Sequence, residues 1–313
     1  MRIPIFLFNG FLEAGKTAFM SHMLTKPVFA DGNNTLVIMC EEGMEEYDEV
    51  FFKERRISLI SLDDPSDLTD QLLLDLNEKC KPARILIEYN GMWDIKKLFE
   101  LNYPEGWFLY QMMTLVNAET FNLYMNNMRS LMMEQFRYAD LVIINRTTDE
   151  TNLSSFRGSV KAVNNQAKLF ICTEDFKLDP VKEALPYDVN AEVLEIKKEH
   201  YGTWYIDLWE KPQQYMNKKV KVSGLFFQDK SDPKDRFTFG RFAMPCCADD
   251  IALMGLYCHN IGKPRFQSKD SISIEAEIKY ERAEVYNGDP GPVLYVKKIQ
   301  KADENQENLV MFN

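Results

Sequence analysis

The sequence predicts an α/β protein with a doubly wound, mostly parallel sheet in its first part and a small, mainly β domain after it. Two observations lead to this fold class. Through about residue 175, short apolar segments alternate with longer helical patterns, which is the order of parallel strands joined by helices. Beyond about residue 200, polarity alternates with a period of two, and Gly, Pro and Asp punctuate the loops, as in antiparallel sheets.

Segments of the first part are predicted to be strands because they are short, apolar and rich in β-branched residues. They are residues 3–8, 35–40, 57–62, 84–89, 108–118, 140–145 and 168–173. Several are almost continuously apolar, as expected of strands that are buried on both faces. Residues 65–81 and 120–139 have helical patterns and are predicted to connect strands. Ligands of such sheets bind at the carboxyl ends of the strands.

The second part predicts a small antiparallel barrel of the OB type. Its expected strands lie within residues 204–227, 237–244, 271–285 and 292–300. The predicted organisation is a nucleotide-binding domain at 1–180, a connector at 181–202, the barrel at 203–302 and a flexible tail at 303–313.

Composition bounds the functional class. The chain has 313 residues, 45% hydrophobic and 27% charged, and a net charge of −11, which argues against a general binder of nucleic acids. An oligonucleotide-binding barrel stays an alternative only if Lys218, Lys219 and Lys221 form a basic stripe. No apolar run reaches the roughly 18 residues that span a bilayer, and six cysteines are too sparse for a disulfide scaffold. A reducing cytoplasm is therefore the expected location.

The stretch GFLEAGKT at residues 10–17 is the strongest local signal. It has the pattern G-x-x-x-x-G-K-[ST] and stands between a predicted strand and a predicted helix. Glycines allow the loop to wrap a polyphosphate, and the following helix presents free N–H groups to it. Lys16 would reach the β- and γ-phosphates, and the Thr17 hydroxyl would bind Mg²⁺. The alternative is a glycine turn with an exposed lysine, which the strand–loop–helix order disfavours.

Three further segments stand in order after later strands: CEEGMEEYDE at 40–49, IEYNGMWD at 87–94 and NRTTDE at 145–150. Together with the phosphate loop they resemble the CobW-like metallochaperone GTPases, over about the first 175 residues. That family shows GFLGAGKTT, NEFGE, E-T-x-G and NKxD segments. The residues that match are Gly10, Gly15, Lys16, Thr17, Glu41, Gly43, Glu88, Gly91 and Asn145.

The resemblance implies a P-loop NTPase fold, GTP and Mg²⁺ as cofactors, and a nucleotide-dependent homodimer. It implies catalytic roles for Lys16, Thr17, Glu41 and Glu88, with Thr17 and Glu41 also on Mg²⁺. The nucleotide-binding residues it implies are Gly10, Gly15, Lys16, Thr17, Ala18, Gly91, Asn145, Arg146 and Asp149.

The departures from the family pattern leave guanine preference and hydrolysis open. Glu13 replaces a small residue in the phosphate loop. In the NKxD position, Arg146 replaces Lys and Thr148 replaces Asp, with Asp149 one residue later. The family's C-x-C-C metal motif is absent, and Cys40 at this place stands alone, as a buried small side chain rather than a ligand. The acidic run at 41–49 fits either a cation site and switch loop or a solvated loop.

The segment GRFAMPCCADDIALMGLYCH at 240–259 suggests zinc. The candidate ligands are Cys246, Cys247, Cys258 and His259, with Asp249 or Asp250 as a carboxylate. Adjacent residues of a strand point to opposite faces, so a single site needs a turn near Pro245. The alternative is a reduced cysteine pair without metal. From Tyr201 to Lys301 the chain is similar to the soluble C-terminal domain of YcgQ-type permease-associated proteins.

The sequence therefore predicts a cytoplasmic GTP-binding protein that couples Mg·nucleotide binding or slow hydrolysis to handling or delivery of a transition metal, zinc or cobalt. A client protein or membrane permease is the expected partner, and nucleic acid is not. The alternative is a binding module without enzymatic activity, in which a degenerate P-loop is retained and the C-terminal domain docks the partner.

Overall fold

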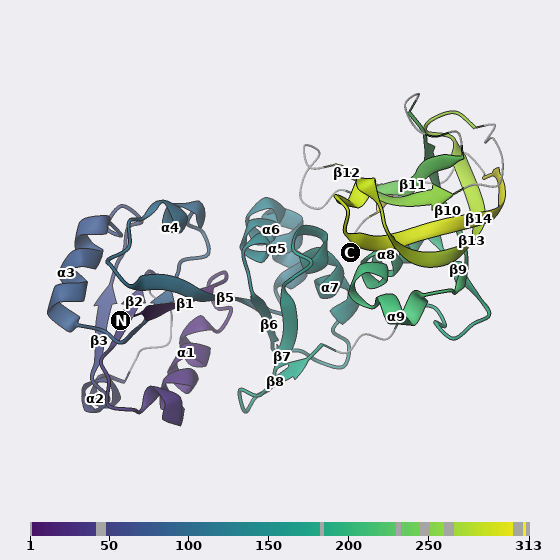
Figure 1. Ribbon diagram of the computed structural model, residues 1–313. Coiled ribbons are helices and arrows are strands. Elements are labelled where there is room, and N and C mark those ends of the chain that lie inside the picture. Colours follow the sequence, from purple (N-terminus) through teal and green to yellow (C-terminus); the bar gives the residue numbers. More distant parts are fainter. Residues whose placement is uncertain are drawn as a thin grey trace. The chain divides into compact units, whose positions relative to one another are not determined.

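The computed structural model describes residues 2–41, 48–181, 185–229, 233, 235–243, 251–259, 266–302 and 309–310. The chain divides into two compact units (Figure 1). Unit 1 comprises Met1–Leu153 and Val163–Lys182, and unit 2 comprises Ser154–Ala162 and Glu183–Asn313.

Unit 1 is built on one sheet with the strand order β3-β2-β4-β1-β5-β6-β7-β8. All neighbouring strands are parallel except β8, which runs antiparallel to β7. The strands are β1 (Ile3–Asn9), β2 (Thr35–Met39), β3 (Ile57–Ser61), β4 (Arg84–Glu88), β5 (Trp107–Asn117), β6 (Leu141–Asn145), β7 (Lys168–Cys172) and β8 (Leu178–Pro180). The predicted mostly parallel sheet is confirmed.

Helices of unit 1 pack on both faces of this sheet and enclose two apolar cores. The core with α1 and α2 contains Phe19 and Phe52, and the core with α3 and α4 contains Leu73 and Leu98. The helices are α1 (Lys16–Thr25), η1 (Pro27–Phe29), α2 (Glu49–Glu54), α3 (Asp70–Cys80), α4 (Lys96–Glu100), α5 (Phe121–Asn127) and α6 (Arg129–Arg137). The helix predicted at 120–139 is divided at Met128, whose φ and ψ of −137° and 35° are not helical.

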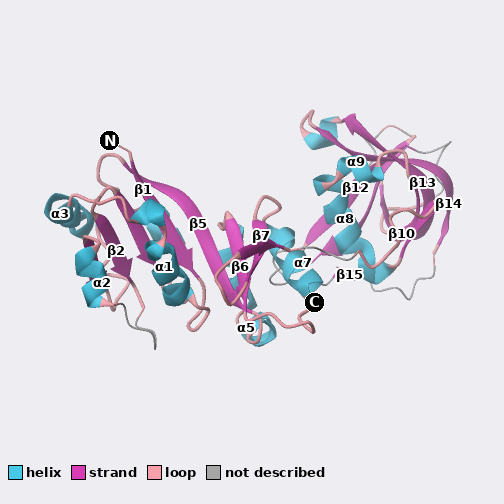
Figure 2. Cartoon of the chain, turned by 90° about the horizontal axis from the view of Figure 1, so that it is seen from below, coloured by secondary structure: helices cyan, strands magenta, loops and turns pink. Residues whose placement is uncertain are grey.

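Unit 2 contains a closed five-stranded barrel (Figure 2). Strand β10 pairs with β13 and with β11, β11 pairs with β12, β12 runs parallel to β14, and β14 pairs with β13. This connectivity is that of an OB barrel, so the predicted architecture is confirmed. The strands are β10 (Lys219–Phe227), β11 (Arg236–Ala243), β12 (Ala252–His259), β13 (Ser271–Arg282) and β14 (Pro290–Lys301).

One part of the strand prediction for unit 2 is wrong. Residues 201–215 form helices α8 (Tyr201–Glu210) and α9 (Pro212–Tyr215) instead of a strand. Tyr201, Trp204 and Leu208 are fully buried, at spacings of three and four residues, so they make one helical face. Pro212 then starts α9 at a position that needs no N–H donor.

Two further strands extend the barrel's sheet. Within the expected connector, η2 (Lys198–His200) follows β9 (Val193–Ile196), which pairs in parallel with β10. A flexible tail was expected at the C-terminus, yet β15 (Leu309–Val310) pairs with β11, and Val310 is buried. The remaining element is η4 (Glu284–Tyr286). Lys219 and Lys221 face Glu192 and Glu195 at 3.3 and 3.1 Å, so glutamates offset the predicted basic stripe.

Helix α7 (Leu153–Val163) is held in unit 2 by buried charges. Arg157 donates to the fully buried Asp207 at 2.5 Å and also pairs with Glu210, which in turn pairs with Lys161. The Tyr215 hydroxyl donates to Asp207 at 3.1 Å. Burial, followed by its hydrogen bond with Tyr187, raises the pKa of the Tyr215 phenol. Every charge of this cluster has an opposite charge beside it.

Candidate functional site

The loop between β1 and α1 has the backbone that its glycines predict. Gly10 and Gly15 have φ values of 140° and 85°. A Cβ on Gly10 would lie 2.4 Å from the Leu115 carbonyl oxygen, and one on Gly15 would lie 2.4 Å from Asn145 Nδ2. Side chains are therefore excluded at both positions by contacts with the ends of β5 and β6. Asn9, which sequence reasoning missed, fixes the loop's entry by accepting the Gly10 N–H at 2.9 Å.

Lys16 is the centre of this loop, and only 3% of it is exposed. Its ammonium donates to the carbonyl oxygens of Gly10 at 2.8 Å and Phe11 at 3.0 Å, and to the carboxylate of Glu41. A lysine ammonium has three N–H donors, so these contacts use all of them. The contact between Lys16 and Glu41 is an ion pair, which sequence reasoning missed.

Thr17 is the second polar group of the loop, and its hydroxyl donates to Glu88 Oε1 at 2.7 Å. Glu88 is the last residue of β4 and is 2% exposed. Cys40 N–H donates to the Glu88 carbonyl at 2.8 Å, which holds the ends of β2 and β4 together. The Glu41 and Glu88 carboxylates therefore contact Lys16 and Thr17 at one edge of the sheet, with Ala18 next in the first turn of α1.

Asn145 lies at the end of β6 and binds the phosphate loop. Its Nδ2 donates to the Ala14 carbonyl at 2.6 Å, while its Oδ1 is buried and accepts no hydrogen bond within the described residues. An unsatisfied buried acceptor is costly, so this oxygen is a position for a ligand's donor. Arg146 and Asp149 lie in the exposed loop that follows, Arg146 with φ of 52°.

Gly91 fits against the phosphate loop. A Cβ on it would lie 2.3 Å from the Gly10 carbonyl oxygen and 2.9 Å from the Phe11 nitrogen. The buried side chain of Gln135 on α6 donates to the Gly91 carbonyl at 2.8 Å. Asn90 Oδ1 accepts the Met92 N–H at 2.9 Å, so the peptide between residues 91 and 92 is held at both ends. Sequence reasoning missed Gln135; its signal is one amide on the buried, Met-rich face of a helix.

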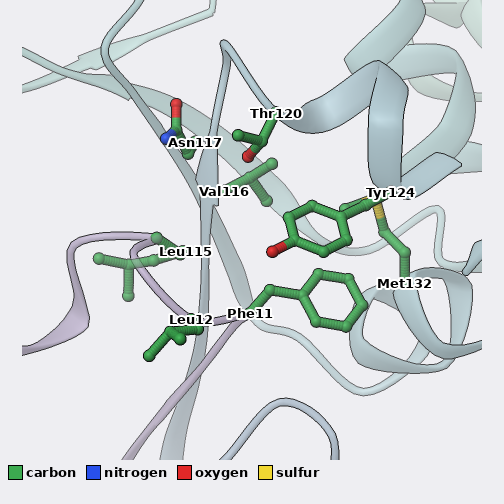
Figure 3. A pocket seen from close by; sticks show the side chains of 9 residues that line it. Phe11, Leu12, Leu115, Val116, Asn117, Thr120, Tyr124 and Met132 are labelled. Atoms are coloured by element: carbon green, nitrogen blue, oxygen red, sulfur yellow. The ribbon is translucent and has the colours of Figure 1, made fainter. Parts of the chain in front are cut away.

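The phosphate loop also borders a small pocket, which Figure 3 shows. Phe11 stacks on Tyr124 of α5 with ring centroids 4.2 Å apart and planes 17° apart. The buried Asn117 at the end of β5 accepts the Glu119 N–H at 2.9 Å. Glu13, by contrast, is exposed with φ of 60°, so its carboxylate is directed to solvent at a backbone position that favours glycine.

The zinc prediction receives no geometric support from the described residues, among which no group of three or more His, Cys, Asp and Glu side chains is placed to hold a metal. Cys258 is fully buried in the barrel, and this burial raises the pKa of its thiol well above the ordinary value. His259, on the opposite face of β12, stacks on Tyr295 with centroids 4.7 Å apart. Cys246, Cys247, Asp249 and Asp250 lie outside the described residues, as does Gly43.

Cys40 is 1% exposed, and burial, then the nearby Glu88 and Glu41 carboxylates, raise the pKa of its thiol to about 12. Cys40 is accordingly a buried small side chain rather than a thiolate ligand.

A glycine-shaped loop at a helix start, a buried lysine, and a threonine beside a strand-end carboxylate define a P-loop nucleotide-binding protein. Residues 4–171 match the family model "CobW/HypB/UreG, nucleotide-binding domain", and the chain belongs to that family. Residues 172–311 match the model "DUF1980 C-terminal domain". The two resemblances noted in the sequence are thereby confirmed.

Two solved structures that resemble the chain come from a hydrogenase maturation factor and from a GTPase. Hydrogenase maturation factor HypB from Archaeoglobus fulgidus is 15% identical, with 54% of this chain and 80% of that chain covered and a TM-score of 0.38. Zn(II)-bound YjiA GTPase from E. coli is 17% identical, with 88% of this chain and 94% of that chain covered and a TM-score of 0.43. A search of curated proteins found no match. In the described part of the chain, every helix is too short or too polar to cross a bilayer.

Proposed function

We propose that this protein binds Mg·GTP at residues 10–17 and hydrolyses it slowly, and that the nucleotide cycle controls the handling of a transition metal. The observation that carries the nucleotide half is the buried Lys16, which faces two loop carbonyls and a carboxylate. A buried ammonium on a loop that opens onto the start of a helix is a binding position for phosphate.

The donor set also fits Mg²⁺. The Thr17 hydroxyl and the carboxylates of Glu88 and Glu41 are hard oxygen ligands at the same edge of the sheet. The ion would neutralise charge on the transferring phosphoryl group. Lys16 would hold the phosphates in line, and Gly91, which is fixed on the loop by Gln135, would present its backbone where a third phosphate ends. The buried Asn145 Oδ1 would accept a donor from the bound nucleotide.

The metal half of the proposal comes from the CobW resemblance and names zinc or cobalt as cargo. A client protein or a permease as recipient, a nucleotide-dependent homodimer and a cytoplasmic location are parts of the same proposal. The exposed and altered loop at Arg146 to Asp149 favours a second candidate, a protein that binds nucleotide without turnover and docks a partner through unit 2.

Turnover separates the two candidates. We expect slow, Mg²⁺-dependent release of phosphate from GTP by the full chain. Thr17→Ala should abolish this release, because it removes the hydroxyl that contacts Glu88 and is proposed to bind Mg²⁺. Thr25→Ala is the matched control, since its hydroxyl donates to the His22 carbonyl at the exposed end of α1. Nucleotide binding without phosphate release above the Thr17→Ala rate, with or without Zn²⁺ or Co²⁺, would establish the second candidate instead.

A further inference from the structure

The two polar side chains of the phosphate loop are both engaged by carboxylates. Lys16 contacts Glu41, and Thr17 contacts Glu88. Only the Glu41 contact joins opposite charges, and both partners are largely buried, with 2% of the Lys16 side chain and 10% of the Glu41 side chain exposed. Water screens such a pair far less than it screens a surface pair.

Of the three acceptors on Lys16, only Glu41 is free to leave. The carbonyls of Gly10 and Phe11 belong to a backbone confined by the Leu115 carbonyl and by Gly91. Glu41 follows Cys40, whose N–H is bound to the end of β4, so the backbone before Glu41 is anchored while its side chain can rotate. A phosphate oxygen that approaches the ammonium must therefore take the place of the Glu41 carboxylate.

We propose that Glu41 is a built-in competitor for nucleotide phosphate at Lys16 and thereby sets the site's demand for Mg²⁺. A nucleotide without metal brings its phosphate charge to the Lys16 ammonium, where the Glu41 carboxylate is already bound. With Mg²⁺ present, the displaced carboxylate gains a cation to bind, and the phosphate gains Lys16. Glu41 thus changes from a competitor of the phosphate to a ligand of the cation. This inference rests on the proposed function.

The test is calorimetric titration of the full chain with GDP, once in EDTA and once with Mg²⁺. We expect Glu41→Gln to bind metal-free GDP at least about tenfold more tightly than wild type, a gain of about 1.4 kcal/mol. The factor by which Mg²⁺ improves GDP binding, which measures the coupling of the two ligands, should fall in the same variant. Glu78→Gln is the matched control: it makes the same substitution at an exposed carboxylate of α3, so it should gain no metal-free affinity.

The titrations distinguish failure of the competition from failure of the proposed function. If wild type binds Mg·GDP and Glu41→Gln gains nothing in EDTA, the competition is refuted while the proposed function stands. If wild type and both variants bind no nucleotide with or without Mg²⁺, both fail. Should Glu41→Gln not fold, Glu41→Asp serves, because its carboxylate is one methylene farther from Lys16; metal-free affinity equal to wild type there would also refute the competition.

Discussion

Two clusters of buried charge in the described residues differ in kind, and the contrast between them separates a binding site from a structural cluster. At the phosphate loop, Lys16 pairs with Glu41 beside a backbone shaped by glycines. In unit 2, Asp207 is contacted by Arg157, Lys211 and Tyr215, with Glu210 beside them. The second cluster joins side chains of α7, α8 and α9 to one another.

The difference lies in what surrounds the charges. Around Lys16, a carboxylate can be exchanged for another anion, and Asn145 Oδ1 has no partner in the described part of the chain. Around Asp207, charged and hydroxyl donors converge on one carboxylate that is 0% exposed, so the cluster is saturated. Burial of an ion pair alone therefore does not identify a functional site; an exchangeable partner beside a glycine-confined backbone does.

The largest effect on stability should come from the saturated cluster. We expect Asp207→Asn to lower the free energy of unfolding by about 3–5 kcal/mol, because the buried Arg157 loses the charge of Asp207 inside the protein. Urea unfolding followed by tryptophan fluorescence would measure it. Nucleotide affinity should change less than about twofold, because Asp207 and the phosphate loop belong to different compact units and share no partner in the described residues.

Asp75→Asn is the control for this prediction, since Asp75 is an exposed helix residue that contacts only Gln71 in the described hydrogen bonds. A surface substitution of this kind should leave the unfolding curve nearly unchanged. If Asp207→Asn instead altered nucleotide affinity as strongly as stability, the division between the two clusters would not hold.

Gln135→Leu should have a smaller effect, and we expect it to change nucleotide affinity. The Gly91 carbonyl would lose its donor and be left buried without one, at a cost of about 1–3 kcal/mol. Because Gly91 is proposed to face the third phosphate, we expect affinity for a non-hydrolysable GTP analogue to fall about tenfold while GDP affinity stays within about twofold. Competition binding with a fluorescent nucleotide gives both constants.

Gln71→Leu provides the matched comparison, because it makes the same substitution at an exposed amide in the first turn of α3. Equal weakening of the diphosphate and the triphosphate by Gln135→Leu would mean that Gln135 only supports the fold. Gly91→Ala should act in the same direction more strongly, since its Cβ would meet the Gly10 carbonyl at 2.3 Å.

Much of unit 1 was predictable because its determinants are local. Continuous apolar runs mark the buried parallel strands, and the G-x-x-x-x-G-K-T pattern places Lys16 and Thr17 directly. The ordered segments follow β2, β4 and β6, and Glu41, Glu88 and Asn145 contact the phosphate loop from the ends of these strands. In unit 2, the alternation at 271–285 and 292–300 predicted β13 and β14.

The remaining features depend on contacts between distant segments. Gln135 acts on Gly91 from 44 residues away, and no local pattern distinguishes it from other helical amides. The helical α8 was missed because Trp204, Tyr205 and Ile206 favour strands, and packing of Tyr201 and Trp204 in the barrel core outweighs that preference. Cys258 and His259 were grouped as candidate zinc ligands because they are adjacent in the sequence, whereas the strand directs their side chains to opposite faces.

The most direct test of the account is whether residues 10–17 hold a guanine nucleotide. Calorimetric titrations of the full chain with Mg·GTP, Mg·GDP and Mg·ATP, beside Lys16→Ala and the exposed-lysine control Lys79→Ala, answer it. We predict guanine-nucleotide binding with a dissociation constant on the order of micromolar in wild type and Lys79→Ala, and a loss of at least about 100-fold in Lys16→Ala. Absence of binding by wild type to all three nucleotides, or unchanged binding in Lys16→Ala, would contradict the account.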